Sequence, residues 1–416
     1  MTPEVKKRIE QIQQGIVPEG YVKDKDGIYP RDWASKKIGQ WLKLAERPIV
    51  LQDEEEYQLV TVRRGFGGVD SRGSFLGKNV LVKNYFIVKT GDFIISKRQI
   101  AHGACGIVPP ELDGAVVSNE YNVFLPQDGT NIQMFNLMMQ LPHYKRLFYL
   151  MSDGVHIEKL LFKTQDWMKR KLAMPLLKEQ KKIAEILATQ DKVIELKEKL
   201  LAEKRQQKKY LIQQLLTGKK RLHGFHGEWK REKLGKLFAE RNETQCAHLE
   251  LLAITGTQGV IPRSKLDLKD NSSEDKSKYL HICVGDIGYN TMRMWQGVSA
   301  YSNYEGIVSP AYTILKPKGK VNAKYFSYLF KLPEVVFTFF RFSQGLVDDT
   351  RNLKYENFKT ICVTYPEDIQ EQNVIASILE KADQEIDLLC QAIEQEKKKK
   401  KALMQLLLTG IVRVKA

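Results

Sequence analysis

Two short segments of the chain come close to known catalytic loops, but neither has the residues that the chemistry needs. A phosphate-binding loop follows the pattern G-x-x-x-x-G-K-[ST], whereas residues 73–79 (GSFLGKN) are one residue short and end in Asn79. Nucleotide binding by that mechanism is therefore not expected. A DNA amino-methyltransferase must hold its flipped base, typically in an Asp/Asn-Pro-Pro-aromatic loop. The Pro-Pro pair at residues 109–110 lies between Val108 and Glu111 and lacks both flanks.

The acidic, histidine and cysteine residues are not spaced as metal ligands. The acidic run at residues 53–56 is typical of a solvated surface, and His223 and His226 lie in a short linker without further ligands nearby. The glycine-rich residues 65–68 indicate a turn rather than a cofactor loop. The sequence therefore predicts no catalytic residue, no metal site and no cofactor on this chain. The cysteines occur singly, which favours reduced cytoplasmic thiols over a zinc ribbon or a disulfide framework: Cys105, Cys246, Cys283, Cys362 and Cys390.

The balance of charge indicates a polyanionic partner. The 416-residue chain has 66 Lys and Arg against 50 Asp and Glu, for a net charge of +16. Such an excess favours nucleic acid, and a basic but otherwise ordinary soluble protein is the alternative. The apolar content of 43% allows hydrophobic cores, and the length allows two domains. Since no apolar run could span a membrane and no signal peptide is visible, a cytoplasmic location is expected.

One long segment occurs twice. Residues 179–218 and residues 371–410 align without a gap at a constant offset of 192, and both open with Glu-Gln and close with Leu-Leu-Thr-Gly. Both copies are rich in Leu, Ile, Glu, Gln and Lys, lack proline and end at a glycine, which predicts two long helices. At 1.5 Å per residue, each helix would be about 60 Å long.

A heptad seam runs along each predicted helix. Apolar heptads sustained over this length predict that the two helices pair as a coiled coil. Lys208 and Lys400 interrupt the two seams in the same register, where a polar residue fixes the pairing at some cost in stability. The alternative is that each helix lies on its own domain. The seam positions are Leu187, Ile194, Leu201, Lys208 and Leu215 in the first copy, and Leu379, Ile386, Ile393, Lys400 and Leu407 in the second.

The segments that precede the two helices share sparse anchors, such as Trp33 with Trp229 and Gly91-Asp92 with Gly285-Asp286. Strand-like runs predominate in both, and helical patterns follow near residues 131–151 and 322–342. Each half is therefore expected to be an α+β domain that ends in its long helix. The expected strands lie at residues 57–62, 80–89, 93–96, 116–125, 311–315 and 360–364.

The combination of these motifs resembles a known family. Residues 175–187 (PLLKEQKKIAEIL) lead into a helix that ends LLTGKKRL at residues 215–222, and the second copy ends LLTGIVRV at residues 407–414. Together with the Trp-x4-Ile/Leu-Gly openings at Trp33 and Trp229, this resembles the specificity (S) subunit of type I restriction–modification systems. The resemblance covers nearly the whole chain and rests on the repeat, the spacing and the motifs taken together.

The resemblance implies an α+β fold in which two α/β target-recognition domains are joined by two long conserved helices. These helices would pair as an antiparallel coiled coil, with a pseudo-two-fold internal repeat. The implied domains are an N-terminal helical extension (1–32), target-recognition domain 1 (33–174), conserved helix 1 as central spacer (175–218), a linker (219–228), target-recognition domain 2 (229–366) and conserved helix 2 as distal spacer (367–412).

The resemblance also implies a non-catalytic, sequence-specific DNA-binding subunit. Each domain would read one half of a split, asymmetric site in double-stranded DNA, and the helices would set the gap and dock two methyltransferase (modification) subunits. S-adenosylmethionine is expected on those partners, which methylate adenine. ATP and Mg²⁺ are expected on the motor–nuclease (restriction) subunits of the full complex.

Reading bases requires Arg, Lys, Asn or Gln on loops that reach the major groove, while other basic groups hold phosphates. Each residue chosen below could instead contact a phosphate or be solvated, and Trp295 could belong to the core. In domain 1 the expected DNA-binding residues are Arg63, Arg64, Arg72, Lys97, Arg98 and Gln99. In domain 2 they are Asn290, Thr291, Arg293, Trp295 and Gln296, with Gln258, Arg263, Arg341 and Arg351 as second choices.

Two other functions fit parts of the sequence. A stand-alone architectural or regulatory DNA-binding protein would have the same charge and the same helical spacer but no enzyme partner. A methyltransferase that includes its own specificity region would need cofactor and base-holding motifs, which the sequence lacks.

Overall fold

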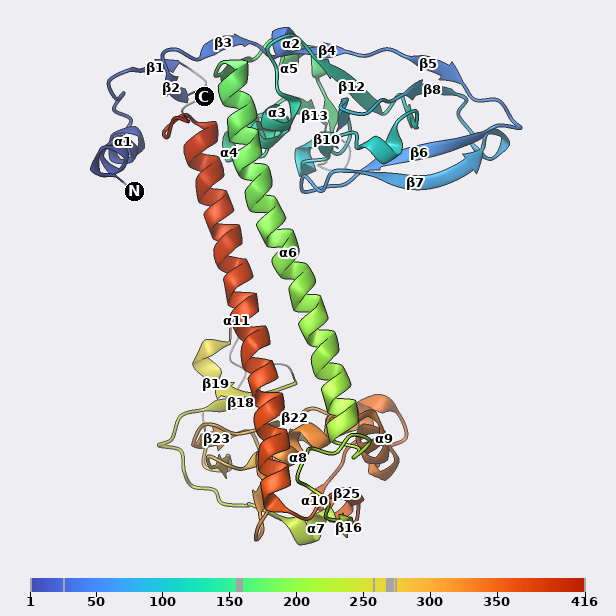
Figure 1. The fold of residues 1–416 in the computed structure, drawn as a ribbon, viewed down its shortest axis with the longest axis vertical. Coiled ribbons are helices and arrows are strands. Elements are labelled where there is room, and N and C mark those ends of the chain that lie inside the picture. Colours follow the sequence, from blue (N-terminus) through green and yellow to red (C-terminus); the bar gives the residue numbers. More distant parts are fainter. Residues whose placement is uncertain are drawn as a thin grey trace. The chain divides into compact units, whose positions relative to one another are not determined.

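The computed structural model describes residues 2–414 except 25–26, 155–159, 257–258, 267–272 and 274. The chain forms two compact units: unit 1 comprises Met1–Leu196 with Ile393–Ala416, and unit 2 comprises Lys197–Ala392. The two long helices, α6 (Leu177–Leu215) and α11 (Ile369–Leu408), each contribute one part to unit 1 and the other part to unit 2 (Figure 1). The helices expected from the repeat are therefore present, with their bounds shifted by three residues at most.

Unit 1 contains an α+β domain with two main sheets. The four-stranded sheet has the order β10-β9-β12-β4, and the five-stranded sheet has the order β5-β8-β11-β6-β7. The strands of the first sheet are β4 (Leu42–Leu44), β9 (Phe93–Ser96), β10 (Cys105–Ile107) and β12 (Tyr121–Pro126). Those of the second are β5 (Pro48–Val50), β6 (Glu56–Val62), β7 (Val69–Leu76), β8 (Asn84–Ile87) and β11 (Val116–Ser118).

Strand β9 lies between two hydrophobic cores, which is why all four of its residues are buried. Phe93 and Ile95 pack with the helices of unit 1, whereas Ile94 packs in the second core with Val60 and Val123. Alternation along a strand sends successive side chains to opposite faces. The helices of this domain are α2 (Ile38–Trp41), α3 (Ile132–Met139), α4 (Pro142–Leu150) and α5 (Thr164–Met168), with short 3-10 turns η1 (Gly77–Asn79), η2 (Ile100–His102) and η3 (Pro110–Leu112).

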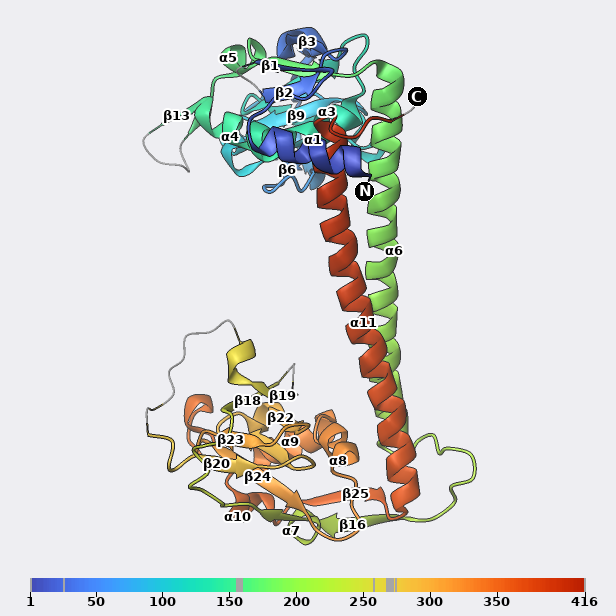
Figure 2. The same ribbon diagram turned by 90° about the vertical axis from the view of Figure 1, so that its left-hand side faces the viewer.

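The domain is closed by antiparallel pairing between its first strand, β3 (Ala34–Lys37), and its last, β15 (Lys171–Met174). A further short pair joins β13 (Ser152–Asp153) and β14 (Leu161–Phe162). The expected N-terminal helical extension is helix α1 (Pro3–Gln13) followed by a hairpin of β1 (Tyr21–Asp24) and β2 (Gly27–Pro30). This segment lies against the end of α11, since Arg8 donates to the Ile411 carbonyl and Tyr21 donates to the Gly410 carbonyl (Figure 2).

Unit 2 repeats the four-stranded sheet and the closing strand pair of unit 1, while its described residues form the two-stranded pairs β18-β19 and β20-β23 in place of the five-stranded sheet. Its four-stranded sheet has the order β17-β24-β21-β22, which matches β4-β12-β9-β10, and β16 pairs with β25 as β3 pairs with β15. The strands are β16 (Trp229–Lys233), β17 (Phe238–Glu240), β18 (Leu252–Thr255), β19 (Gly259–Pro262), β20 (Leu280–Ile282), β21 (Ile287–Asn290), β22 (Ser299–Tyr301), β23 (Gly306–Val308), β24 (Tyr312–Pro317) and β25 (Cys362–Pro366). The helices are α7 (Leu234–Leu237), α8 (Ala323–Leu329), α9 (Pro333–Phe342) and α10 (Tyr355–Phe358), with turns η5 (Arg263–Lys265), η6 (Met294–Gln296) and η7 (Asp348–Thr350).

Two of the expected strands in domain 1 were wrong in extent. The expected strand at residues 80–89 is only β8, because Val80 ends the turn of η1 and Leu81 and Val82 are exposed. The expected strand at residues 116–125 is two strands, because the chain turns at residues 119–120 and passes from the five-stranded sheet into the four-stranded sheet. Hydrophobicity alone cannot distinguish one strand from two that meet at such a turn.

The two long helices run antiparallel within each unit. In unit 1, Lys400 Nζ lies 2.5 Å from Asp191 Oδ1. In unit 2, Lys204 Nζ lies 2.7 Å from Glu385 Oε2, and Lys208 forms an ion pair with Asp383. From Lys204 to Lys208 the residue number on α6 rises, while that of the partner on α11 falls from Glu385 to Asp383, as antiparallel helices require. The seam lysines are therefore accounted for: Lys208 and Lys400 are repeat equivalents, as are Asp191 and Asp383, so each copy contributes the same lysine and the same aspartate.

The Glu-Gln pair that opens each repeat copy is buried and anchors each helix to its domain. Gln180 Nε2 donates to the Pro175 carbonyl, and its Oε1 accepts from the amide that precedes α3. Gln372 does the same with the Pro366 carbonyl and the amide that precedes α8. Since both amide side chains are fully buried and hydrogen-bonded at both ends, the repeated Gln is a structural requirement.

The neighbouring glutamates hold the ends of the opposite helices. Glu371 binds Arg221, just beyond α6, with Nε–Oε1 2.8 Å, and Glu179 binds Arg413, just beyond α11, at 2.9 Å. The hydrogen bonds that Arg413 donates to Glu179 and to Asp32 raise the pKa of Arg413 above its ordinary value. In each unit the same contact thus joins the start of one long helix to the end of the other.

A glycine with positive φ ends each long helix. Gly410 has a φ of +71°, and a Cβ there would lie 2.5 Å from Pro30 and 2.9 Å from the Trp33 ring. Gly218 has a φ of +70°, and a Cβ there would lie in ordinary contact with the Trp229 ring, at 3.4 Å. The tryptophan that opens each domain therefore packs on a helix-ending glycine, which explains why both residue types recur in the repeat.

We expect the seam ion pair of unit 1 to contribute a measurable coupling energy. In a double-mutant cycle on Lys400→Ala and Asp191→Ala, urea unfolding followed by circular dichroism should give a coupling of about 0.5–1 kcal/mol. The matched control is the exposed pair Lys192 and Glu195 on α6 alone, whose cycle should give no more than about 0.5 kcal/mol. Equal coupling in both cycles would contradict a role for Lys400 in helix pairing.

Candidate nucleic-acid interface

The expected DNA-binding residues of domain 2 lie on a turn that follows β21. The chain leaves the sheet at Asn290, whose side chain accepts from the Met292 amide, and forms η6 before Gly297 at a φ of +78°. Met294 is buried and anchors the turn, so that Arg293 and Gln296 are exposed. The turn therefore presents a basic and an amide side chain, as the sequence predicted, on a backbone held by its own hydrogen bonds.

Trp295 lies against α9 and is half-buried. Its ring centroid is 6.1 Å from that of Phe340, and its Nε1 donates to the Met292 carbonyl at 3.0 Å. Phe337 stacks on the same Phe340 ring and is 60% exposed. Trp295 thus packs the turn against α9. Phe337, which also contacts Phe340, is exposed, and it was not among the residues predicted from the sequence.

Two of the second-choice arginines converge on the same place. Arg351 lies over the Phe340 ring at 4.2 Å and donates to Asp348, while Arg341 is exposed in the last turn of α9. The Leu353 amide donates to the Thr291 carbonyl, which ties this segment to the turn. We call residues 290–296, 337–342 and 344–353 the domain-2 turn cluster. Three segments far apart in the sequence therefore lie together, with Arg293 and Arg341 exposed and Arg351 half-buried.

Domain 1 has a related arrangement around η2. Lys97 and Arg98 follow β9 as Thr291 and Met292 follow β21, and Gly103 ends η2 at a φ of +76° as Gly297 ends η6. Arg98 is paired with Glu120, with Nε–Oε2 2.6 Å. The Oε1 atom of Gln99 is buried and has no hydrogen-bond partner among the described residues. Lys97 and Arg98 are thus better placed than Gln99 to reach a ligand.

The turn that holds Arg63 and Arg64 packs directly on η2. The Gly65 amide donates to the His102 carbonyl at 2.7 Å, and the Phe66 amide donates to the Gly103 carbonyl at 2.8 Å. Both arginines are exposed, and Arg63 is paired with Asp70. The structure therefore brings Arg63 and Arg64 to the same turn system as residues 97–99, across a separation of more than thirty residues in the sequence.

The remaining predicted residues lie elsewhere. Arg72 is exposed on β7, and Arg263 is half-buried in η5, where its amide donates to the Leu251 carbonyl. Gln258 lies outside the described residues. None of the contacts described for Arg72 and Arg263 joins them to the two turn systems.

The sequence analysis missed the buried ion pairs that hold these turns. Arg47 binds Asp92 through two hydrogen bonds of 2.7 and 3.0 Å, and Arg241 binds Asp286 at 2.8 Å. Asp92 raises the pKa of Arg47, and both aspartates are buried. In the sequence, the only sign of these ion pairs that we noted was the Gly-Asp dipeptide shared by the two domains, Gly91-Asp92 and Gly285-Asp286. Each pair fixes the start of a strand: β9, which leads into residues 97–99, or β21, which leads into residues 290–296.

Leu346 and Val347 are a second omission. They lie in the loop between Gln344 and Asn352, which are paired as an isolated bridge, and Leu346 is 99% exposed. With Phe337 and Phe342, which are 60% and 40% exposed, they make the domain-2 turn cluster rich in exposed apolar side chains.

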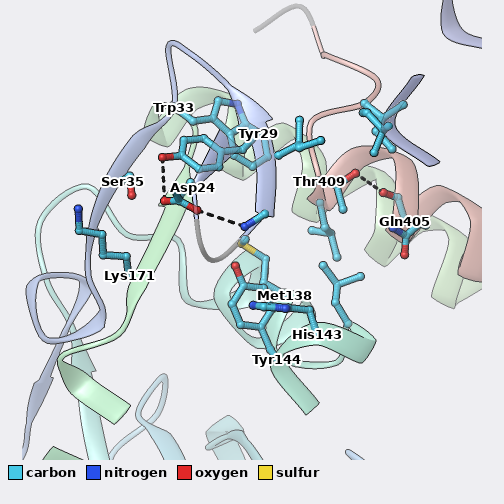
Figure 3. A pocket seen from close by; sticks show the side chains of 17 residues that line it. Asp24, Tyr29, Trp33, Ser35, Met138, His143, Tyr144, Lys171, Gln405 and Thr409 are labelled. Carbon is cyan, nitrogen blue, oxygen red and sulfur yellow. Dashed lines mark hydrogen bonds between the residues drawn. The ribbon is translucent and has the colours of Figure 1, made fainter. Parts of the chain in front are cut away.

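Unit 1 contains a cavity of about 270 Å³ at the junction of the N-terminal hairpin, the helices of domain 1 and the end of α11 (Figure 3). Apolar side chains such as Trp33, Met138 and Leu408 line it. Tyr29 donates to Asp24 at its rim. Such a lining is typical of a packing gap where elements meet.

None of the helices in the described part of the chain combines the length and the apolar character that crossing a bilayer requires.

Known proteins resemble this chain in sequence and in fold. Residues 30–205 match the family described as the type I restriction modification DNA specificity domain. The fold is similar to that of the HsdS subunit from Thermoanaerobacter tengcongensis, with 16% identity over 92% of this chain and 98% of that chain and a TM-score of 0.51. It is also similar to the type I restriction–modification S subunit from M. genitalium, with 13% identity, coverage of 90% and 96% and a TM-score of 0.54.

A third similar chain belongs to a structure described as the basis of complex assembly and conformational transition of the type I R-M system, with 15% identity, coverage of 92% and 99% and a TM-score of 0.52. The expected resemblance and fold class are therefore confirmed, with the fold shared over nine-tenths of each chain.

We predict that Lys331 makes the stability of unit 2 depend on pH. Its Nζ donates to the carbonyls of Gly297 and Ser299, at the end of the η6 turn, and burial together with Lys208 lowers its pKa to about 8. Because the folded pKa lies below the unfolded value of 10.5, the folded state binds fewer protons between these values. The contribution of Lys331 to stability is therefore least favourable below pH 8 and rises with pH across this window.

The measurement compares urea unfolding of the wild type and Lys331→Met. The wild-type advantage in unfolding free energy should rise by about 1–2 kcal/mol from about pH 7.5 to about pH 9.5. Lys316→Met, at an exposed position of β24, serves as the control and should show no such trend. A pH-independent difference at Lys331 would contradict the prediction.

Proposed function

We propose that the whole chain is the specificity subunit of a type I restriction–modification system, because residues 30–205 match the family described as the type I restriction modification DNA specificity domain. It recognises DNA sequence and carries no catalytic centre of its own. The observation that carries the proposal is the duplication. Two domains that share a four-stranded sheet and a closing strand pair present different basic turns, residues 63–99 in one and the domain-2 turn cluster in the other. Its place of action is the cytoplasm, where DNA and the partner subunits are found.

Each domain reads one half of a bipartite site in double-stranded DNA. Arginine forms bidentate contacts with guanine, and exposed basic groups on rigid turns are suited to this task. Arg293 lies on a turn whose backbone is fixed by Met294 and Gly297, which holds its starting point in place. Leu346 and Val347 provide apolar contact of the kind that thymine methyl groups accept. Since the two turn systems differ in residue type, the two half-sites would differ in sequence.

The paired helices set the gap between the half-sites. Helices of 39 and 40 residues are each about 60 Å long, compared with about 34–36 Å for one turn of B-DNA. The antiparallel pairing, repeated ion pairs and buried Glu-Gln anchors within each unit are those of a spacer that resists sliding. The gap length in base pairs would follow from this fixed register.

The same helices dock two modification subunits. Leu196 on α6 and Leu388 on α11 are repeat equivalents, and they are 53% and 65% exposed. A leucine left exposed at the same position of both copies supports two equivalent protein contacts, because solvated helix faces favour polar residues. Those subunits would bind S-adenosylmethionine, and the restriction subunits of the full complex would bind ATP and Mg²⁺.

We expect that exchanging one recognition domain changes one half-site alone. A chain in which residues 33–174 come from another family member, assembled with the modification subunits, should methylate adenine in a site with one new half, the same second half and an unchanged gap. Sequencing of methylated adenines in host DNA measures this. Exchange of residues 229–366 is the matched control and should change only the other half.

Two results would contradict the proposal. One is a change of both half-sites on a single exchange. The other is a chain that binds its DNA site without any modification subunit and supports no methylation when the subunits are supplied, which would favour a stand-alone architectural or regulatory DNA-binding protein.

A further inference from the structure

A nitrogen, a sulfur and a carboxylate meet beside the β20–β23 pair of domain 2. His281 Nε2 lies 3.0 Å from Glu305 Oε1 and 3.6 Å from Cys283 Sγ, and one ligand atom from each residue lies within 4.8 Å of the others. His281 is half-buried, with 13% of its side chain exposed. These are the three ligand types that transition-metal sites of proteins use.

The strand register explains why these side chains share one face. Ile282 is fully buried in the core, so His281 and Cys283, on either side of it, point outward together. His281 is paired with Ile307, and Glu305 lies two residues before Ile307, in the turn that precedes β23. Backbone pairing therefore brings the segments that carry the three side chains next to one another.

Glu243 orients the histidine from the opposite side. Its Oε2 lies 3.0 Å from His281 Nδ1, and its Oε1 accepts from Arg241 at 2.7 Å, which holds the carboxylate in place. When Nδ1–H donates to Glu243, the Nε2 lone pair is free and faces Cys283 and Glu305. A carboxylate behind the histidine is the usual outer partner of a metal-binding imidazole, because it fixes the tautomer and raises the basicity of the ligand.

We propose that His281, Cys283 and Glu305 bind a divalent transition-metal ion, Zn²⁺ being the best match, with water at the fourth position. Zn–N and Zn–O bonds of about 2.0–2.1 Å and a Zn–S bond of about 2.3 Å place tetrahedral ligands about 3.3–3.6 Å apart. The two distances of 3.0 and 3.6 Å at His281 Nε2 are close to that spacing. On binding, the Cys283 thiol releases its proton to solvent and the thiolate donates an electron pair to the ion.

Domain 1 shows that the shared fold does not require these residues. The pairing of His281 with Ile307 corresponds to that of Ile87 with Val116 in domain 1. By this register His281, Cys283 and Glu305 occupy the places of Ile87, Lys89 and Gly114. At these places domain 1 has a five-stranded sheet. Among the described residues of domain 2, an isolated bridge between Leu251 and Ile307 joins β23 to the segment just before β18.

The ion would therefore have a structural role. It would join the end of β20 to the turn before β23, next to the loop that carries Glu243. There the described residues of domain 2 form two-stranded pairs where domain 1 has a five-stranded sheet. The inference goes beyond the proposed function, and it depends neither on the DNA sequence recognised nor on the partner subunits.

The test uses the untagged full-length chain, treated with a chelator and then titrated with Co²⁺ as a spectroscopic substitute for Zn²⁺. We expect one Co²⁺ per chain, a thiolate-to-cobalt charge-transfer band, displacement by one equivalent of Zn²⁺, and a higher melting temperature with Zn²⁺. Cys283→Ser should lose the charge-transfer band and the thermal shift. Cys246→Ser is the matched control, because this half-buried cysteine of the same domain lies outside the cluster, and it should keep both.

Glu243→Gln should weaken metal binding about 10- to 100-fold while keeping the charge-transfer band, since Glu243 positions His281 without touching the ion. If Cys283→Ser fails to fold, Glu305→Gln gives the second test and should weaken binding while keeping the band. The proposal is overturned if no Co²⁺ binds at equimolar concentration, or if the band survives Cys283→Ser. Absence of metal binding together with a raised His281 pKa by NMR would identify the cluster as an imidazolium held between two carboxylates.

Discussion

The polar contacts that cross between α6 and α11 are the constraint on which both units depend. The ion pairs Lys400–Asp191 and Lys208–Asp383 can form only when the helices are antiparallel and in one register. Glu179 and Glu371 are buried, and each is paired with an arginine just beyond the other helix. A shift of either helix would leave these carboxylates buried and unpaired, at a cost of several kcal/mol. The apolar seam supplies the attraction between the helices, and the charged positions select one arrangement.

This constraint also determines how each domain is attached. The tryptophan that opens a domain packs on the glycine that ends a long helix, and the buried glutamine that opens a long helix binds the amide before α3 or α8. Helix register and domain position are therefore linked through residues that both repeat copies share. The turns that present basic side chains lie outside this set, so their residues can change without loss of the scaffold. That separation is what a protein needs if its binding sequence is to vary while its partners stay the same.

The sequence predicted the elements with strong periodic patterns and missed what depends on tertiary contacts. Both long helices, the seam and the two lysines were predicted because heptads and an ungapped repeat are local signals, whereas their antiparallel direction came from the family resemblance. The turn of residues 290–296 was found from its residue types. The packing of this turn with Phe340 and Arg351 was not predicted, because three segments far apart in the sequence form that surface. His281, Cys283 and Glu305 were missed for the same reason: a search for closely spaced ligands does not detect residues that strand pairing brings together.

The central claim is that the paired helices measure the distance between two independent reading domains. The most direct measurement inserts one heptad into each helix, after Leu196 in α6 and after Ala392 in α11, so that the seam and its ion pairs are kept. The assembled complex is then tested by sequencing methylated adenines. Seven residues add about 10 Å, so the account predicts the same two half-sites with a gap longer by about three base pairs. Methylation at the original gap, or a change in either half-site sequence, would contradict it.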